Sequence, residues 1–123
     1  MIFRQTFVGA PSSVPQARHF AKVTLSGLST EVVDAATLMV SELVTNAIQH
    51  ATSLFEVTIE CDDAHLQIDV SDNGSGHPEA RNPEVTDPHG RGLQIVGRLA
   101  DTWGVRAPDG GWHKSVWFTL GLP

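Results

Sequence analysis

The sequence predicts a two-layer α/β sandwich in which helices cover one face of a mixed, mostly antiparallel sheet. Helical patterns dominate the first half of the chain and strand patterns the second, an order typical of this fold class. Two segments of alternating apolar and polar residues are separated by Asp62-Asp63, which predicts an antiparallel hairpin. Because the chain has 123 residues and no visible repeat or linker, we expect a single domain over residues 1–123.

Each predicted element depends on a local signal. Ser12 or Ser13 can cap the first helix and Thr30 the second, because these hydroxyls accept hydrogen bonds from free N–H groups. Residues 73–91 are rich in Gly, Pro, Asp and His, which predicts a long loop, and long loops in compact domains tend to be functional. The expected elements, in order, are a strand over 3–8, helices over 12–28 and 30–51, strands over 54–61 and 66–71, a helix over 93–100, and strands over 103–106 and 115–120.

Composition and charge narrow the classes of function. The net charge is −6 and the eight Lys and Arg residues are scattered, which argues against a surface that follows nucleic-acid phosphates. No apolar run approaches the roughly 20 residues that a membrane helix needs, and the N-terminus lacks the pattern of a secretory signal. The lone Cys61 fits a reducing compartment. These features predict a soluble, cytoplasmic domain that binds neither nucleic acid nor membrane.

The second predicted helix carries polar residues on the side that faces the core. On a helical wheel of residues 31–50 the apolar residues share one wide arc, with Asn46 and His50 inside it and Glu42 at its edge. The three side chains are spaced to lie one above another on the helix. Either they are satisfied polar residues of the core boundary, or they face a cavity where a carboxylate and an amide oxygen hold a hydrated cation such as Mg²⁺.

Two glycine-containing segments follow this helix in the sequence. Asp72 stands at the end of an apolar strand, where it can accept a hydrogen bond from a ligand's amino group, and Gly74 and Gly76 let the backbone approach that ligand. Alternatively, these residues form an ordinary hairpin turn. The segment Gly90-Arg91-Gly92-Leu93 opens the third predicted helix, where free N–H groups form a site suited to phosphate.

Other ligand-binding motifs are incomplete. No Gly-Lys-Ser/Thr ending of a Walker loop is present, and a dinucleotide fingerprint from Gly90 would need glycine where Ile95 stands. An EF-hand loop from Asp69 would need glutamate at its twelfth position, which is Ala80. No two of the six histidines have metal-ligand spacing, so a zinc site is not expected.

Taken in order, the motifs resemble the boxes of the GHKL ATPase superfamily, which includes gyrase and histidine kinases. The boxes are Glu42-x-x-x-Asn46, Asp72-x-Gly74-x-Gly76 and Gly90-x-Gly92-Leu93. The longer segments around these boxes are similar to those of the stand-alone bacterial anti-sigma-factor serine/threonine kinases, and the similarity covers nearly the whole chain. These segments are SELVTNAIQHA, IDVSDNGSG, HGRGLQIV and SVWFTL. The resemblance implies a Bergerat-type ATP-binding fold that binds ATP and Mg²⁺.

The resemblance also implies a role for each motif residue. Asn46 would ligate Mg²⁺, Glu42 would act as general base or position the acceptor hydroxyl, and Asp72 would bond the adenine amino group. Many relatives carry Gly-Thr in the last strand, where the Thr supports that Asp, and here Ser115 would take its place. The remaining implied contacts are Gly74 and Gly76 at the purine, and Gly90, Arg91, Gly92 and Leu93 at the phosphates, with residues 77–91 as a mobile ATP lid.

The resemblance implies a serine/threonine protein kinase that sequesters a sigma factor and phosphorylates an antagonist protein. Two alternatives stay open. One is an ATP-dependent protein-binding module without kinase activity; the other is an isolated histidine-kinase catalytic domain, which is less expected because no helical segment with a phosphoacceptor histidine precedes the site. Relatives often dimerise, so a homodimer is possible. Arg18 on the first helix would meet a partner protein or would simply be solvated.

Overall fold

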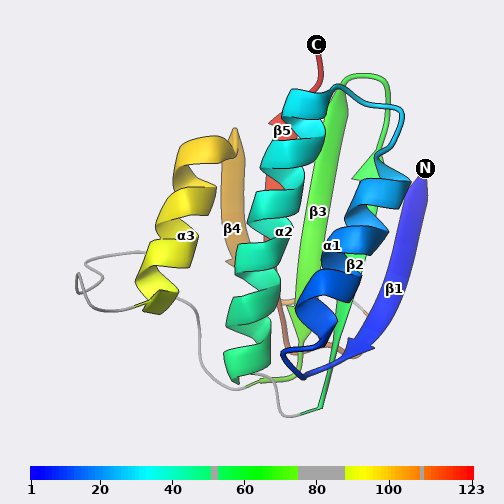
Figure 1. Cartoon of the computed structure of the whole chain (residues 1–123). Helices are drawn as coiled ribbons and strands as arrows, with labels where there is room; N and C mark the ends of the chain where they lie inside the picture. Colours follow the sequence, from blue (N-terminus) through cyan, green and yellow to red (C-terminus); the bar gives the residue numbers. More distant parts are fainter. Residues whose placement is uncertain (51–52, 75–87, 109) are drawn as a thin grey trace.

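The computed structural model describes residues 1–50, 53–74, 88–108 and 110–123 (Figure 1). The described part contains five strands and three helices, as the sequence predicts. In chain order these are β1 (Ile2–Val8), α1 (Ser13–Thr24), α2 (Thr30–His50), β2 (Leu54–Cys61), β3 (His65–Asp72), α3 (Pro88–Leu99), β4 (Thr102–Arg106) and β5 (Lys114–Gly121).

The strands form one sheet in the order β1-β2-β3-β5-β4, and every pair of neighbours is antiparallel. The sheet is therefore fully antiparallel in the part that the structure describes, rather than mixed. The last strand in the sequence, β5, lies between β3 and β4. Figure 1 shows all three helices on the same face of the sheet, which confirms the predicted two-layer arrangement.

The core lies between the sheet and the helices. Alternate residues of the central strands point toward the helices, as the period of two in a strand requires. Each fully buried large apolar side chain stabilises the fold by roughly 1.5–3 kcal/mol. The largest of these buried side chains are Phe55, Phe118, Leu25, Met39, Leu43, Ile59, Leu66, Ile68 and Leu93.

The predicted starts of the first two helices differ in detail from the observed ones. Ser12 occupies the N-cap position of α1, as predicted, but its side chain makes no capping hydrogen bond. The Ser13 hydroxyl donates to the carbonyl of Val8 at 2.7 Å and so joins α1 to the end of β1. Ser29, rather than Thr30, caps α2, because its Oγ accepts from the N–H of Val32 at 3.3 Å.

The ends of the helices differ as well. Helix α1 stops at Thr24, before the predicted Leu28, and the chain then turns, with the N–H of Leu28 donating to the carbonyl of Leu25 at 3.0 Å. Helix α3 begins at Pro88, well before the predicted Leu93. Proline suits the first helical position because its missing N–H would be unpaired there in any case.

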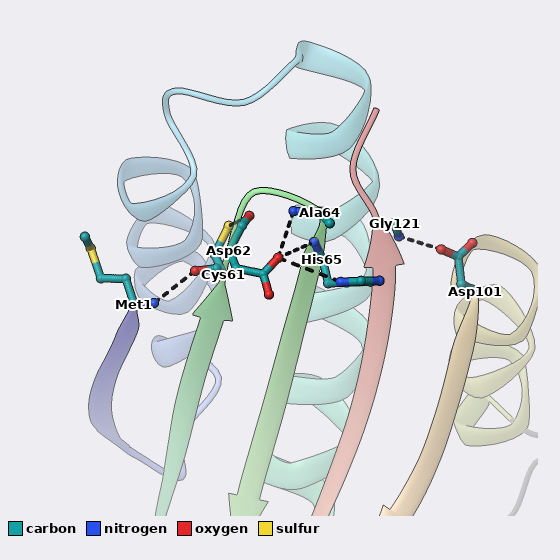
Figure 2. A network of polar contacts seen from close by, with 7 residues as sticks. All are labelled: Met1, Cys61, Asp62, Ala64, His65, Asp101 and Gly121. Carbon is teal, nitrogen blue, oxygen red and sulfur yellow. Dashed lines mark hydrogen bonds and ion pairs between the residues drawn. The ribbon is translucent and has the colours of Figure 1, made fainter.

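Side-chain contacts hold the strand ends at the end of the sheet where β2 turns into β3 (Figure 2). Asp62 Oδ1 accepts from the backbone N–H groups of Ala64 and His65, both at 2.7 Å, which confirms the predicted hairpin turn. The terminal amine of Met1 donates to the carbonyl of Cys61, and the N–H of Gly121 donates to Asp101 Oδ2. This end is opposite to the one where α2 and β3 finish (Figure 1).

No helix in the described residues is long and apolar enough to cross a membrane.

Candidate functional site

The three predicted boxes lie on or next to three elements that meet at one end of the molecule, whereas the predicted Ser115 lies on β5. Figure 1 shows the C-terminal end of α2, the C-terminal end of β3 and the N-terminal end of α3 at this end, the lower one in that view. Helix α3 packs against α2, and α2 also packs against β3. The fold therefore brings the first two predicted boxes and the start of the third into one region.

Asn46 is a polar residue of α2 that is buried without a visible partner for its side-chain oxygen among the described residues. It is 6% exposed, and its side-chain oxygen accepts no hydrogen bond from any described residue. By contrast, the hydroxyls of Thr37 and Thr45 on the same helix donate to the carbonyls of Val33 and Ser41 at 2.6 and 2.8 Å. Leaving a buried acceptor unpaired costs about 1–3 kcal/mol. Among the described residues the fold bears this cost at Asn46, which makes its side-chain oxygen a candidate for ligand binding.

Glu42 lies one helical turn before Asn46 and is partly buried, in agreement with the predicted position at the edge of the apolar arc. His50 follows one turn after Asn46 and is also partly buried. The helix therefore presents a carboxylate and an unpaired amide oxygen one above the other. These are oxygen ligands of the kind that Mg²⁺ accepts in proteins.

Asp72 is the most deeply buried carboxylate at this end, with 1% of its surface exposed. Its Oδ1 accepts from the N–H of Gly74 at 2.7 Å, and the ammonium nitrogen of Lys114 lies 3.8 Å from the same oxygen. Burial raises the pKa of the Asp72 carboxyl above its ordinary value, while the Gly74 hydrogen bond and the Lys114 charge act in the opposite direction. The side chain is thus held in place at the end of β3 by a backbone contact and a buried cation.

Gly74 occupies a position that admits no side chain. A Cβ atom added there would lie 2.2 Å from the carbonyl oxygen of His50 and 3.0 Å from Asp72 Oδ1. The segment after β3 therefore packs directly on the last turn of α2, and only glycine allows that approach. This contact fixes Asp72 relative to the helix that carries Glu42 and Asn46.

The third box lies at the start of α3. Gly90 and Arg91 fall in the first turn of this helix, and Gly92 follows them. The end of the predicted loop, residues 88–91, is therefore helical. Leu93 is a core residue, 2% exposed. Free N–H groups at a helix start favour an anion. Gly76 and residues 77–87 of the predicted lid lie outside the described residues.

Ser115 does not lie beside Asp72. Its hydroxyl donates to Asp69 Oδ2 at 2.8 Å, on the face of the sheet opposite to the helices. The strand register pairs Ser115 with Ser71 and pairs Lys114 with Asp72. Neighbouring residues of a strand point to opposite faces, so Lys114, and not Ser115, faces the predicted site.

Lys114 is a buried neighbour of Asp72 that the sequence reasoning did not single out. A lysine in an apolar strand is an unusual choice, since lysine is rarely buried without a partner, and that signal was present in His113-Lys114-Ser115. Arg18 is exposed and lines a cavity of about 490 Å³ between α1 and α2, together with Asp34 and other residues of both helices.

A sequence-family comparison agrees with this geometry. The profile of the histidine kinase-like ATPase domain matches residues 7–119. The chain belongs to this family. A search of curated proteins gives no match. The matched residues of the chain run from the end of β1 into β5, so they include all three boxes. Family membership supports ATP binding, which in GHKL-type domains usually involves Mg²⁺.

The described residues fit such a metal, although no group of three or more His, Cys, Asp or Glu residues in the described ranges could enclose an ion. Mg²⁺ bound with a nucleotide needs few protein ligands, because phosphate oxygens and water fill the remaining positions. The buried oxygen of Asn46, unpaired among the described residues, would supply one such ligand.

Proposed function

We propose that the chain binds Mg-ATP at the end of the molecule where α2, β3 and α3 meet, and that it transfers the γ-phosphate to a serine or threonine of another protein. The observation that carries the proposal is the buried Oδ1 of Asn46, unpaired among the described residues and one helical turn from Glu42. An acceptor left without a partner costs free energy that a bound cation would recover.

In this proposal the base of the nucleotide lies against the end of β3. Asp72 accepts a hydrogen bond from the adenine amino group, and Gly74 forms part of the wall beside the purine. Gly76 extends this wall. The phosphates lie at the start of α3, where the free backbone N–H of Gly90 and the Arg91 guanidinium contact them, and Gly92, without a side chain, leaves room for them.

Asn46 holds the metal through its side-chain oxygen. When bound, Mg²⁺ neutralises charge that develops on the phosphate oxygens. The burial of Asn46 keeps the amide from competing interactions with water, and this favours a single orientation of the oxygen.

Glu42 acts on the serine or threonine hydroxyl that accepts the phosphate. In the transfer, the serine or threonine oxygen forms a bond to the γ-phosphorus, and the bond from that phosphorus to the β,γ-bridging oxygen breaks, which leaves ADP. Glu42 accepts the proton that the hydroxyl loses, or holds the hydroxyl in line for attack. Its partly buried position one turn from Asn46 supports this role.

The resemblance to anti-sigma-factor kinases supports the choice of partners. We propose that the protein sequesters a sigma factor and phosphorylates a small antagonist protein. An ATP-dependent binding module without transfer is the second candidate, since ATP binding alone would support it. A histidine-kinase catalytic domain is the third.

Calorimetric titration of ATP with and without Mg²⁺ tests the binding site. The wild type is compared with Asn46→Ala and with Gln49→Ala, which removes an exposed amide from the same helix as a control. We expect saturable binding that weakens without Mg²⁺, and Asn46→Ala should weaken binding at least about tenfold, given about 1.5–3 kcal/mol for an interaction with a charged group. Gln49→Ala should behave as the wild type. Equal Mg²⁺ dependence in wild type and Asn46→Ala would remove Asn46 from the metal site.

Transfer of radiolabelled γ-phosphate separates the three functional candidates. Acid-stable label on a foreign serine or threonine supports the kinase, and Glu42→Gln should lower that rate about 100-fold or more while ATP still binds. Acid-labile label on a histidine would support the histidine-kinase alternative. ATP binding without any transfer, in the presence of candidate antagonist proteins, would support the binding module.

A further inference from the structure

Lys114 places a buried ammonium group beside the carboxylate that is proposed to receive the base. The β3–β5 register pairs Lys114 with Asp72, and Nζ lies 3.8 Å from Oδ1. The two side chains are only 5% and 2% exposed. Burying a lysine among apolar strands is costly unless its charge has a compensating partner. The Asp72 carboxylate is one such partner, so the two charges lie together between β3 and β5.

The two oxygens of Asp72 have different surroundings. Oδ1 accepts from the N–H of Gly74 and is the oxygen nearest to Lys114. The hydrogen bond that Asp72 accepts from a described residue goes to Oδ1. In the proposed site, Oδ2 is the oxygen that receives the amino group of the ligand. An ionised carboxylate only accepts hydrogen bonds, whereas a protonated one also donates.

This difference matters for the choice of purine. Adenine presents an amino group at its 6-position, which donates, while hypoxanthine and guanine present a carbonyl there, which accepts. An ionised Asp72 bonds the amino group and repels the carbonyl. A protonated Asp72 can bond either. A carboxylate that can only accept hydrogen bonds rejects a purine with a 6-carbonyl strongly. It loses this selectivity when protonation lets it donate as well.

We propose that Lys114 is a specificity-determining residue that keeps Asp72 a pure hydrogen-bond acceptor, so that the pocket takes 6-aminopurine nucleotides and rejects 6-oxopurine nucleotides. It acts through Asp72 and so is a positioning residue. The proposal rests on the ATP site proposed above and adds to it the group that sets base selectivity.

The charges around Asp72 agree with this role. Burial raises the pKa of this carboxyl, which favours the protonated, unselective form. The groups that lower the pKa are the Gly74 N–H, then Lys114, with smaller contributions from His50 at the end of α2 and His113 just before β5. Lys114 is the largest of the charged contributions. Removing it shifts the balance toward protonation, and the effect is strongest as the pH falls.

The test compares ATP with inosine triphosphate, whose base carries a carbonyl in place of the 6-amino group. Calorimetry between pH 6 and pH 8 gives both affinities for the wild type, for Lys114→Met, and for Lys22→Met. Lys22 is exposed on α1, so the same substitution there removes a positive charge from outside the pair of strands that carries Asp72 and Lys114. A further variant, Lys114→Gln, serves where Lys114→Met does not fold, and Lys114→Arg tests rescue of the charge.

We expect the wild type and Lys22→Met to prefer ATP by about tenfold or more, since a hydrogen bond to a charged group contributes about 1.5–3 kcal/mol. In Lys114→Met and Lys114→Gln the preference should fall to within a few-fold at pH 6 and recover as the pH rises, because Asp72 then ionises. Lys114→Arg should restore the wild-type ratio.

Two results would overturn the inference. An unchanged ratio of ATP to inosine triphosphate affinity in the Lys114 variants, at every pH, would show that the amine does not control selectivity. An equal loss of both affinities would mean that Lys114 supports the fold only. Failure of the wild type to bind ATP at all would instead overturn the proposed ATP site itself, and the two failures are therefore distinguishable.

Discussion

Asp69 and Asp72 are buried on the same strand, β3, and yet their surroundings differ in kind. Asp69 faces away from the helices and is 6% exposed. Its Oδ1 accepts from Gln67 Nε2 at 3.0 Å, and its Oδ2 accepts from the Arg106 guanidinium at 2.8 and 3.2 Å and from Ser115 Oγ at 2.8 Å. Asp72 faces the helices, is 1% exposed, and has one backbone donor and a cation at 3.8 Å.

The difference separates a structural carboxylate from a candidate binding carboxylate. The protein itself supplies hydrogen bonds to both oxygens of Asp69, so this side chain has little left to offer a ligand. Asp72 is more deeply buried but accepts fewer hydrogen bonds, because among the described residues only its Oδ1 accepts one. Since a buried polar group is costly without partners, the open position on Asp72 is the one that a ligand would fill with the greatest gain.

The largest expected effect comes from exchanging Asp72 for asparagine. In Asp72→Asn the Gly74 N–H retains the amide oxygen, so the amide nitrogen takes the place of Oδ2 and presents a donor to the donor group of adenine. We expect the ATP affinity to fall about 100-fold, as for a lost hydrogen bond to a charged group. Calorimetric titration of both proteins with ATP measures this loss of affinity.

The matched control is the same exchange on the other face, Asp69→Asn, which should change the ATP affinity less than about twofold because nothing in the proposed site touches Asp69. Comparable losses of affinity in both variants would mean that the two carboxylates do not differ in function.

The next effect tests how Asp72 is held in position. A Cβ at Gly74 would lie 2.2 Å from the His50 carbonyl oxygen, which is backbone and cannot move aside without shifting the end of α2. We expect Gly74→Ala to lower the free energy of unfolding by about 1–3 kcal/mol, as overpacking does, and to weaken ATP binding as well.

Urea denaturation measures the stability of Gly74→Ala and of a control variant, Gly27→Ala. A Cβ at Gly27 meets nothing within 4 Å, so the control separates overpacking from the general effect of replacing glycine by alanine. Gly27→Ala should leave both the stability and the ATP affinity nearly unchanged. Wild-type stability in Gly74→Ala would show that the contact between the two segments is loose.

The smallest effect concerns the stability that Asp69 provides. Asp69→Asn removes the negative charge that faces Arg106 but keeps an acceptor oxygen. The Arg106 side chain is 54% exposed, so water screens the pair and takes over part of its solvation. We therefore expect a loss of only about 1 kcal/mol in the free energy of unfolding, measured by urea denaturation. A larger loss, well above 2 kcal/mol, would indicate that Asp69 organises the open face of the sheet more strongly than its contacts suggest.

Local patterns in the sequence predicted most of the fold and the part of the site that lies on one helix. The alternation in residues 54–61 gave the observed bounds of β2, because side chains of a strand repeat every second residue. Helical phase placed Asn46 inside and Glu42 at the boundary, as the burial of both residues confirms. These features depend on neighbours a few residues away.

The parts that sequence reasoning missed depend on pairing between distant segments. Ser115 and Lys114 exchange faces if the register of β5 shifts by one residue, and that register is set by β3, more than forty positions earlier in the chain. The predicted start of α3 is also wrong: the helix begins at Pro88, a good first residue of a helix, and continues through Gly90 and Gly92.

The position of β5 in the sheet has a consequence for biosynthesis. This strand follows all the other elements in the sequence, yet it lies between β3 and β4 and brings Lys114 to Asp72. A nascent chain that has not yet released β5 from the ribosome lacks the neighbour that β3 and β4 share, and its Asp72 lacks the cation. The centre of the sheet is therefore complete only once β5 has left the ribosome, after α1 and α2 have already been made.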